Sequence, residues 1–580
     1  MKDRIYTCGL DSGVVSVIVA LCIFCNLGLF RPKGLFAQVP LLERVSFYLQ
    51  EQIEAAVRQP SAASIPLKIT VGGEPIRSSF RLLRFYDQRD YRPGWSDDHG
   101  PFPQVYNLID ALRQAPFHGL RSEHYHLPQI MAFLAGIYET MEDKGAIDPE
   151  ALGDLDLLLT DAFLTYGRSL SAGQVDPDMI EAGWFGRRGE GDLVDDLQRG
   201  LYLNQVDEIL ESFHQPQAEY ARLGQALRSY RGIAARGGWP VLANHPGLLK
   251  MGSRGPHIRD LVRRLWIEGD LDDLSFQIHG DVFDQALKRA VIRFQRRNGL
   301  SADGVVGPDT RAALNIPVEE RIQQLELNME RWRWLPHDLG ERYVVVNIAS
   351  FTLEAIEDSR PVLDMRVIVG SPFRSTPAFS ARIRYLVANP YWHIPPRIAR
   401  EEILPKIQRD PDYLARHHIT VLRGWNKKGE EIDPNGIVWA EVTAGNFRFR
   451  LRQEPGPWNP LGRVKFIFPN RFSIHLHDTP YRDHFQKTRR NLSHGCIRIE
   501  KPVELAEYLL RGDPAWTPEK IRAAVKAGVR QKVPLPEPVP IYLVYFTARV
   551  DEDGLVCFYR DIDGRDLVLA GALRLPPGPW

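Results

Sequence analysis

SIHLHDTP at residues 473–480 and SHGCIRIE at residues 493–500 are the two stretches of this 580-residue sequence that decide its fold and its chemistry. The second contains Cys496, and a thiol is a useful nucleophile only as a thiolate, with a base or a positive field close by. Alternation along a predicted strand puts His475 and His477 on one face. The 15 residues between His477 and the second stretch allow the chain to return beside the first. We therefore predict a Cys496 thiol held ionised beside His477 as its base, with His475 as the second candidate.

The residues beside Cys496 extend the predicted site. Gly495 suits a turn in which the backbone approaches a substrate closely. The backbone N–H groups of Gly495 and Cys496 can hold the oxyanion of a tetrahedral intermediate there. Arg498 shares a face with Cys496 in an extended chain. It either binds a substrate carboxylate through two hydrogen bonds or forms a buried ion pair that braces the loop.

Composition limits the class of protein. A chain of 580 residues is too long for one compact core, so three or more structural units are expected. Its 44% hydrophobic and 25% charged residues are typical of a folded protein. Lys plus Arg and Asp plus Glu both number 73, which gives no net charge and no indication of the basic stripe of a nucleic-acid binder. We expect no nucleic-acid partner.

The N-terminus predicts export. Lys2 and Arg4 precede an apolar run over residues 13–30, which indicates a signal within residues 1–37. The run is close to the length of a membrane-spanning helix, so the signal either is cleaved or remains as a membrane anchor. No other segment is apolar enough to cross a bilayer. We expect the rest of the chain in the periplasm, at the cell envelope.

Cysteine usage agrees with this placement. Three of the five cysteines lie within or beside the export segment, which leaves Cys496 and Cys557 in the folded part. Exported proteins often pair their cysteines, but two in a chain of this length form no disulfide framework. Cys557, in the apolar run GLVCFY, is interpreted as a strand residue. A Cys496–Cys557 bridge stays open as an alternative.

Apolar periodicity predicts a multidomain α+β fold. Residues 40–245 have apolar residues at helical spacing, for example over 105–112 and 155–164, and predict a helical scaffold domain. Residues 340–580 predict a mostly-β domain, in which a polar stretch over 398–447 is expected to be an inserted capping subdomain. The β-branched runs that predict its strands lie at 343–348, 365–370, 381–387, 464–468, 473–477 and 541–550.

Residues 246–316 predict a small three-helix module. One amphipathic stripe consists of Phe283, Leu287, Ala290, Val291 and Phe294. A turn-rich loop, GLSADGVVGPDT at 299–310, leads into a short helix. The sequence AVxxFQ, then GL, DGVVG and TxxALN, closely resembles the common peptidoglycan-binding module of bacterial wall enzymes. The alternative is a helical spacer that binds nothing.

The decisive stretches resemble a known family. A histidine followed after 15 residues by Ser-His-Gly-Cys, an aliphatic residue and arginine is similar to the signature of L,D-transpeptidases with a YkuD-type catalytic domain. The domain order resembles that of the long-form members, so the likeness covers most of the chain. It implies a β-rich fold, Cys496 as the acylated nucleophile and His477 as the proton acceptor and donor. The rest of the predicted site consists of His494, Gly495 and Arg498 as catalytic residues, and of Ser493, His475 and Trp392 as substrate-binding residues.

Other residues match or depart from the pattern of this family. Trp392 lies in NPYWHIPP at 389–396, which matches the stretch entering the family's capping insertion. Many members have glycine where this chain has Asp478 and asparagine where it has Glu500. Long-form relatives often have an aromatic residue at the position of His475. These departures leave Cys496 and His477 intact but put the orientation of the base in question.

The resemblance implies a two-step reaction. The thiolate attacks the carbonyl of the third residue of a donor stem tetrapeptide and expels the terminal D-alanine, which leaves a thioester. The side-chain amine of a diamino acid on an acceptor stem then forms a 3→3 peptidoglycan cross-link. Beta-lactams of the carbapenem type are expected to acylate the same sulfur. No metal and no organic cofactor is needed.

Four alternatives are weighed against this interpretation. Water as the acceptor would make the protein an L,D-carboxypeptidase. A wall-binding scaffold with a decayed catalytic domain is disfavoured by the intact Cys496 and His477. A zinc site built from histidines and Cys496 lacks the further spaced ligands of hydrolytic zinc proteins. In a papain-like peptidase the cysteine opens a helix and precedes its histidine, whereas here His477 comes first.

Overall fold

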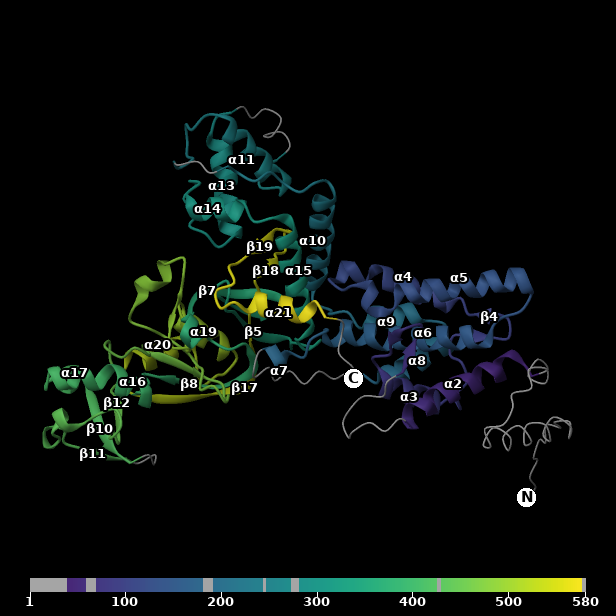
Figure 1. Ribbon diagram of the computed structural model, residues 1–580. Helices are drawn as coiled ribbons and strands as arrows, with labels where there is room; N and C mark the ends of the chain where they lie inside the picture. Colours follow the sequence, from purple (N-terminus) through teal and green to yellow (C-terminus); the bar gives the residue numbers. More distant parts are fainter. Residues whose placement is uncertain are drawn as a thin grey trace, which may run out of the picture.

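The computed structural model describes residues 39–58, 69–180, 191–243, 247–272, 281–424 and 429–575. The chain has a helical domain, a small helical module and a β-rich domain that continues into a cap on the side away from the helical domain (Figure 1). The predicted multidomain α+β fold is confirmed. The predicted export segment lies outside the described residues. Among the described helices, none combines the length and apolar character that a bilayer-spanning helix needs.

The helical domain is built around one long buried helix, α6 (Pro149–Ala172). Asp148 caps its first turn by accepting a hydrogen bond from the Glu150 N–H, and Pro149 fits the first turn because its missing N–H would have no intrahelical partner. Two predicted helical segments, 105–112 and 155–164, lie within α4 and α6 and are confirmed. The other elements are α2 (Leu41–Arg58), β1 (Thr70–Val71), β2 (Glu74–Pro75), α3 (Ser79–Asp87), β3 (Ser96–Asp97), β4 (Gly100–Pro101), α4 (Gln104–Gln114), α5 (Leu127–Lys144), α7 (Pro177–Ile180), α8 (Leu193–Leu203) and α9 (Val206–Ser212).

The module contains α11 (Pro256–Ile267), α13 (Gln285–Arg297) and α14 (Pro308–Leu314). The five apolar residues predicted to form a stripe, Phe283 to Phe294, are all buried in its core. Gln295 organises the turn-rich loop, because its amide donates to Asp303 and to the Val305 carbonyl and accepts from the Gly304 N–H. The loop glycines and the apolar stripe therefore form one packed unit.

Two helices join the module to the other domains. α10 (Ala218–Ala235) and α15 (Val318–Arg333) pack against each other side by side (Figure 1). Their buried apolar residues contribute to the core of the β-rich domain. Phe213 is the last residue in the buried apolar cluster of the helical domain. The buried apolar residues of α10 belong instead to the cluster that forms the core of the β-rich domain. On the module side, the buried Arg297 forms an ion pair with Asp270 and Glu268, and the Tyr230 hydroxyl of α10 donates to Glu268 at 2.8 Å. Removing one partner of such a buried pair typically costs about 3–5 kcal/mol.

The β-rich domain is a nine-stranded sheet in the order β15-β7-β16-β14-β13-β8-β17-β5-β6. Because β6 also pairs with β7, the sheet closes into a barrel, and β15 extends β7 on the outside of the ring. Its strands are β5 (Arg342–Asn347), β6 (Thr352–Glu357), β7 (Arg360–Gly370), β8 (Phe379–Ala388), β13 (Val464–Ile467), β14 (Leu476–His477), β15 (Asn491–Ser493), β16 (Ile497–Ile499) and β17 (Gln531–Val544). Around it lie α19 (Pro502–Leu509), α20 (Pro518–Lys526), β18 (Ala548–Val550), β19 (Val556–Phe558) and α21 (Arg565–Leu573).

Two of the predicted strands need correction. The strand predicted over 473–477 begins only at Leu476, because Ser473 has a left-handed backbone with φ of 57°. The Asn470 side chain stabilises this turn by accepting from the Phe472 and Ile474 N–H groups. The strand predicted over 541–550 is divided between β17 and β18.

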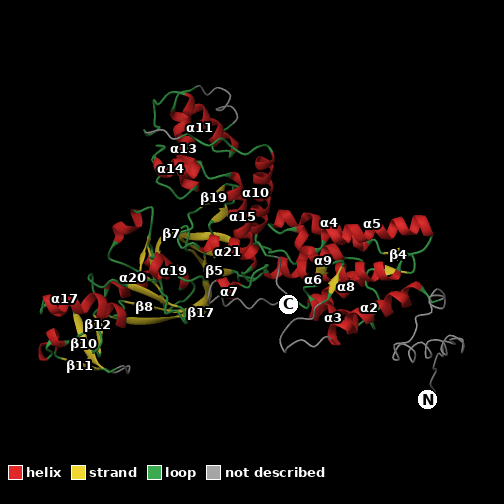
Figure 2. Cartoon of the chain, in the orientation of Figure 1, coloured by secondary structure: helices red, strands yellow, loops and turns green. Residues whose placement is uncertain are grey.

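The predicted insertion is a small subdomain with its own core. Its four-stranded sheet has the order β11-β10-β12-β9, and β10, β11 and β12 lie together at the end of the chain's β-rich part that is far from the helical domain (Figure 2). Its apolar cluster includes Ile403, Leu414, Phe447 and Leu451. Its elements are β9 (Trp392–His393), α16 (Pro396–Ile398), α17 (Leu404–Arg409), α18 (Tyr413–Arg416), β10 (Ile419–Arg423), β11 (Glu430–Ile432) and β12 (Phe449–Gln453).

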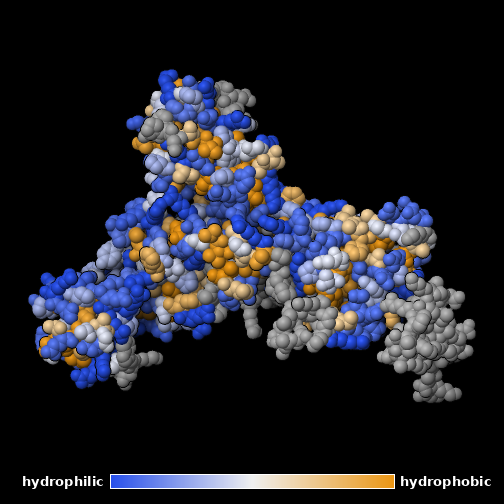
Figure 3. Space-filling model, in the orientation of Figure 1, coloured by the Kyte–Doolittle hydropathy of each residue, from blue (hydrophilic) through white to orange (hydrophobic). Residues whose placement is uncertain are grey.

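The surface of the chain is mixed in polarity. An apolar patch lies over α21, where Leu567 and Val568 are 79% and 55% exposed (Figure 3). Polar residues cover most of the surrounding surface in the same view.

Candidate active site

The barrel brings the two decisive stretches together. β14 and β16 are parallel neighbours, with Leu476 opposite Ile497 and His477 opposite Arg498. Leu476 and Ile497 are fully buried in the barrel core. Alternation along each strand therefore puts His477 and Arg498 on the opposite face, which Cys496 and His475 continue.

Cys496 and His477 are diagonal neighbours on this face. The two residues lie one strand apart and two residues out of register, which corresponds to about 8 Å between Cα atoms. Among the described residues, no hydrogen bond joins the thiol to the ring of His477 or of His475. The Sγ atom lies 3.7 Å from the Ser473 carbonyl oxygen. Both cysteines of the folded part are free thiols.

The tautomer of His477 follows from its neighbour. Nδ1 lies 2.6 Å from the Asp478 carbonyl oxygen, which can only accept, so Nδ1–H is the donor and Nε2 is left to accept a proton. Burial lowers the pKa of His477 to about 3, and the charges of Arg498 and Lys465 act in the same direction. The ring is therefore neutral near pH 7. Burial likewise lowers the pKa of His475 to about 3.

The thiol is also neutral at rest. Burial raises the pKa of Cys496, while a backbone hydrogen bond at His475 and the charges of Lys465 and Arg498 oppose this shift. The site thus holds a neutral thiol and a neutral imidazole, which differs from the ionised thiol expected from the sequence. Proton transfer has to accompany attack on a substrate.

Lys465 is a site residue that the sequence analysis missed. It lies on β13 opposite His477, half-buried, on the face that carries Cys496. Neither Lys465 nor Arg498 has a carboxylate partner in the part of the chain that the structure describes. The buried ion pair considered for Arg498 is therefore not found there. The sequence pattern that could have revealed Lys465 is the alternation over residues 464–468. Val464, Phe466 and Phe468 are buried there, and Lys465 points to the opposite face of the strand.

The turn before Cys496 is held by Ser493. The buried Ser493 hydroxyl donates to the Cys496 carbonyl at 2.6 Å and accepts from the Gly495 N–H at 3.0 Å. Gly495 has φ of 114°, which a residue with a side chain rarely adopts. The Gly495 N–H is thus occupied, whereas the Cys496 N–H has no acceptor among the described residues. Of the two predicted oxyanion donors, only the Cys496 N–H is available.

Two predicted residues lie away from the thiol. His494 is exposed, and its Nε2 lies 2.9 Å from Glu402 Oε1 of the cap, which also pairs with Arg374 at 3.3 Å. This contact links the nucleophile turn to the cap. Trp392 pairs with Gln453 in the sheet of the cap and packs against the cap's core.

The residues that depart from the family pattern brace the site. The Asp478 carboxylate accepts from the Arg463 N–H at 2.9 Å and fills the space beside Gly462, where a Cβ atom would lie 2.4 Å from it. Glu500 forms an ion pair with Arg366 of β7. Both carboxylates line a cavity of about 520 Å³ beyond the ends of β14 and β16. Among the described residues, no group of three or more metal-ligating side chains is arranged to hold a metal ion.

Comparison with family models agrees with this architecture. Residues 341–517 match the "L,D-transpeptidase catalytic domain" of the YkuD family. Residues 254–314 match a "Putative peptidoglycan binding domain", and residues 81–227 match a "Scaffold domain".

Individual relatives match over parts of the chain. A Haemophilus influenzae protein named "Putative L,D-transpeptidase" is 35% identical over 244 residues, which are 42% of this chain and 48% of that protein. The match thus spans about half the length of this relative. Among solved structures, an L,D-transpeptidase from Xylanimonas cellulosilytica is 17% identical with a TM-score of 0.16, covering 52% of this chain and all of that one. One from Mycobacterium smegmatis is 13% identical with a TM-score of 0.17, covering 35% and 58%. The two family matches show that the chain carries a YkuD-type L,D-transpeptidase catalytic domain together with a peptidoglycan-binding domain.

Proposed function

We propose that this protein is a cysteine-dependent L,D-transpeptidase that forms 3→3 cross-links in peptidoglycan. The observation that carries the proposal is the shared barrel face. On it Cys496 and His477 lie beside Lys465 and Arg498, two half-buried cations without a carboxylate partner among the described residues. A nucleophile, a base and an unpaired positive field are what acyl transfer from an anionic peptide requires.

In the first half-reaction Cys496 Sγ attacks the carbonyl carbon of the third residue of a donor tetrapeptide. The thiol proton passes to Nε2 of His477, which the Nδ1–H contact with Asp478 leaves free. The Cys496 N–H holds the oxyanion of the tetrahedral intermediate. When the intermediate collapses, the peptide C–N bond breaks and His477 returns the proton to the leaving amine of D-alanine. The product is a thioester on Cys496.

In the second half-reaction the side-chain amine of a diamino acid attacks the thioester. His477 takes a proton from this amine and returns it to the departing sulfur, so that the enzyme regains its starting state. Water in place of the amine yields a tripeptide and makes the reaction a hydrolysis. The cap, joined to the nucleophile turn through His494 and Glu402, is placed to limit access of water to the thioester.

The two cations are suited to the carboxylates of the stem peptide. Arg498 and Lys465 lie on the face that the donor has to approach, and their half-buried charges gain more from an anionic ligand than exposed charges would. The same field favours a carbapenem carboxylate. We therefore propose carbapenems as acylating inhibitors of Cys496.

The proposed substrate implies the location. Peptidoglycan lies outside the cytoplasmic membrane, so we propose that residues 1–37 export the chain to the periplasm and that the module holds it on the wall.

Incubation of the protein with disaccharide-tetrapeptide, followed by mass spectrometry of the products, tests the proposal. We expect a cross-linked dimer that has lost one D-alanine, and no dimer with the C496A variant. A tripeptide as sole product would mean hydrolysis. An unchanged substrate, with a correctly folded protein, would overturn the proposal.

A further inference from the structure

Thr376 lies directly behind the nucleophile turn. Its Oγ1 donates to the Gly495 carbonyl at 2.7 Å and accepts from the Gly370 N–H at 2.9 Å, and its side chain is fully buried. Thr376 can reach the Gly370 N–H because the chain passes very close to Gly370. A Cβ atom at position 370 would lie 2.1 Å from the Arg374 carbonyl oxygen. Thr376 is thus fixed relative to β7 and to Gly495 at the same time.

Arg565, from the C-terminal part of the chain, holds Thr376 in turn. Its Nη2 donates to the Thr376 carbonyl at 2.6 Å. The Arg565 side chain is 13% exposed, forms an ion pair with Asp563 at 3.1 Å and stacks over the Tyr545 ring at 4.5 Å. Arg565 lies beyond residues 341–517, so it is outside the matched catalytic domain.

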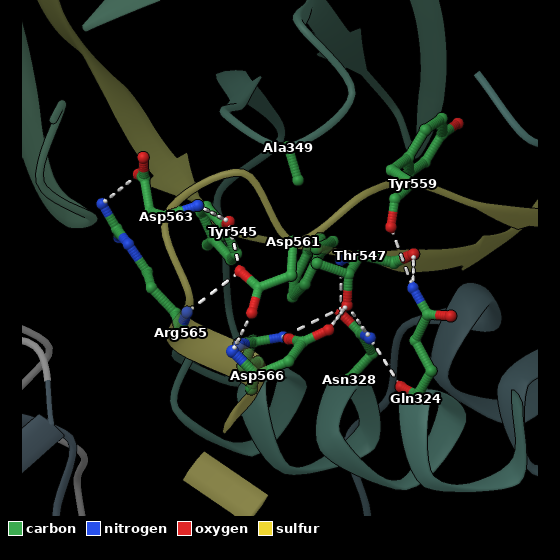
Figure 4. Close-up of polar contacts among 12 residues, drawn as sticks. Gln324, Asn328, Ala349, Tyr545, Thr547, Tyr559, Asp561, Asp563, Arg565 and Asp566 are labelled. Atoms are coloured by element: carbon green, nitrogen blue, oxygen red, sulfur yellow. Dashed lines mark hydrogen bonds and ion pairs between the residues drawn. The ribbon is translucent and has the colours of Figure 1, made fainter. Parts of the chain in front are cut away.

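The segment that carries Arg565 is anchored by a dense polar cluster (Figure 4). Asp561 accepts from the Tyr545 hydroxyl at 2.6 Å and from the backbone N–H groups of Arg565 and Asp566, each at 2.9 Å. Asp566 binds the Thr547 hydroxyl at 2.8 Å and Arg331 of α15 at 2.6 Å. Asp561 thus fixes the backbone at Arg565, while Asp563 and the Tyr545 ring fix its guanidinium group.

We propose that Arg565 and Thr376 are positioning residues that orient the Gly495–Cys496 peptide group for oxyanion binding. The C=O and N–H of a trans peptide group point in opposite directions. The hydrogen bond from Thr376 to the Gly495 carbonyl therefore sets the direction of the Cys496 N–H, the available oxyanion donor. The C-terminal segment thereby becomes part of the catalytic apparatus without touching the substrate.

This inference rests on the proposed acyl transfer, and it predicts an effect on the tetrahedral intermediate alone. A displaced oxyanion donor slows steps that pass through a tetrahedral intermediate, and losing such a donor altogether typically costs about 10²–10³ in rate. Direct displacement by the thiol on iodoacetamide forms no oxyanion. The two residues should therefore affect acylation and leave alkylation unchanged.

The test compares acylation of Cys496 by imipenem with its alkylation by iodoacetamide, both followed by mass spectrometry on the full-length protein. We expect T376V and R565A to slow acylation about 10-fold or more while alkylation changes less than about twofold. T376S, which keeps the hydroxyl, should restore the wild-type rate. R560A is the matched control, because Arg560 in the same segment pairs with Asp309 of the module instead. With disaccharide-tetrapeptide, kcat should fall while KM is unchanged.

The outcomes separate the two proposals. A wild-type protein that imipenem does not acylate at Cys496 contradicts the proposed function itself. A wild-type protein that is acylated, with T376V and R565A acylated at the same rate, overturns the positioning role alone. A parallel fall of acylation, alkylation and melting temperature in both variants also overturns it, because it indicates a purely structural role.

Discussion

Replacing Lys465 by methionine tests the electrostatics of the site. Lys465 lies opposite His477 on β13, and Cys496 lies two strands away and two residues out of register, so strand spacing puts their Cα atoms about 12 Å apart. For an effective dielectric constant of about 20–40, a unit charge at about that distance stabilises a thiolate by about 0.7–1.4 kcal/mol. This corresponds to about 0.5–1 pKa unit. K465M should therefore raise the pKa of Cys496, which burial has already raised, and slow its alkylation near pH 7.5 about 3-fold to 10-fold.

The assay is the pH dependence of iodoacetamide alkylation, followed on the peptide that contains Cys496. In K465M the inflection should move to higher pH, and K465R should keep the wild-type profile because the charge is retained. The matched control is K532M, since Lys532 lies over the Tyr385 ring on an exposed part of β17. Superimposable profiles for K465M and the wild type would refute the reasoning.

Three further predictions concern the histidines and the arginine. H477Q should abolish cross-linking and H475F should keep most of it, because only His477 has a tautomer fixed by the Asp478 carbonyl. An equal loss of cross-linked product in both variants would contradict the assignment of His477 as the base. Arg498 is proposed to bind a carboxylate of the donor, so R498M should raise KM for disaccharide-tetrapeptide at least about 10-fold. An unchanged KM in steady-state kinetics would exclude this contact. Burial lowers the pKa of His118 to about 2. Between about pH 6.5 and pH 2, His118 therefore binds a proton in the unfolded chain but not in the folded chain. The free energy of unfolding consequently falls as the pH falls, by up to about 1.4 kcal/mol per pH unit. Calorimetry should therefore find a smaller drop in melting temperature from pH 7 to pH 5 in H118F, and an equal drop would contradict this.

Periodicity was enough to predict the helical segments 105–112 and 155–164, the core of the module and most of the expected strands. The stripe from Phe283 to Phe294 is buried as expected because apolar spacing reports directly on the face that packs. The strand over 473–477 was predicted too long, because Asn470 and the left-handed Ser473 make a turn that alternation cannot reveal. The cap was interpreted as a polar insertion, although its scattered apolar residues form a core of their own.

The site could be predicted only as far as local patterns reach. Motif spacing brought out Cys496 and His477, and the barrel places them as diagonal neighbours, with His477 on β14 and Cys496 directly before the parallel strand β16. Lys465 was overlooked because its strand contributes to the site through a long-range pairing with β14. Thr376 and Arg565 lie 120 and 69 residues from Cys496 along the chain, and only tertiary contacts connect them to it.

The central claim, a thioester on Cys496 formed from the stem peptide, has one most direct test. Rapid quenching of the protein with disaccharide-tetrapeptide, followed by mass spectrometry of the peptide that contains residue 496, should detect an adduct with the mass of the donor minus D-alanine. The adduct should be absent in C496A and should disappear when an acceptor stem is added. Turnover of the tetrapeptide by C496A at the wild-type rate, with no adduct in either protein, would contradict the account.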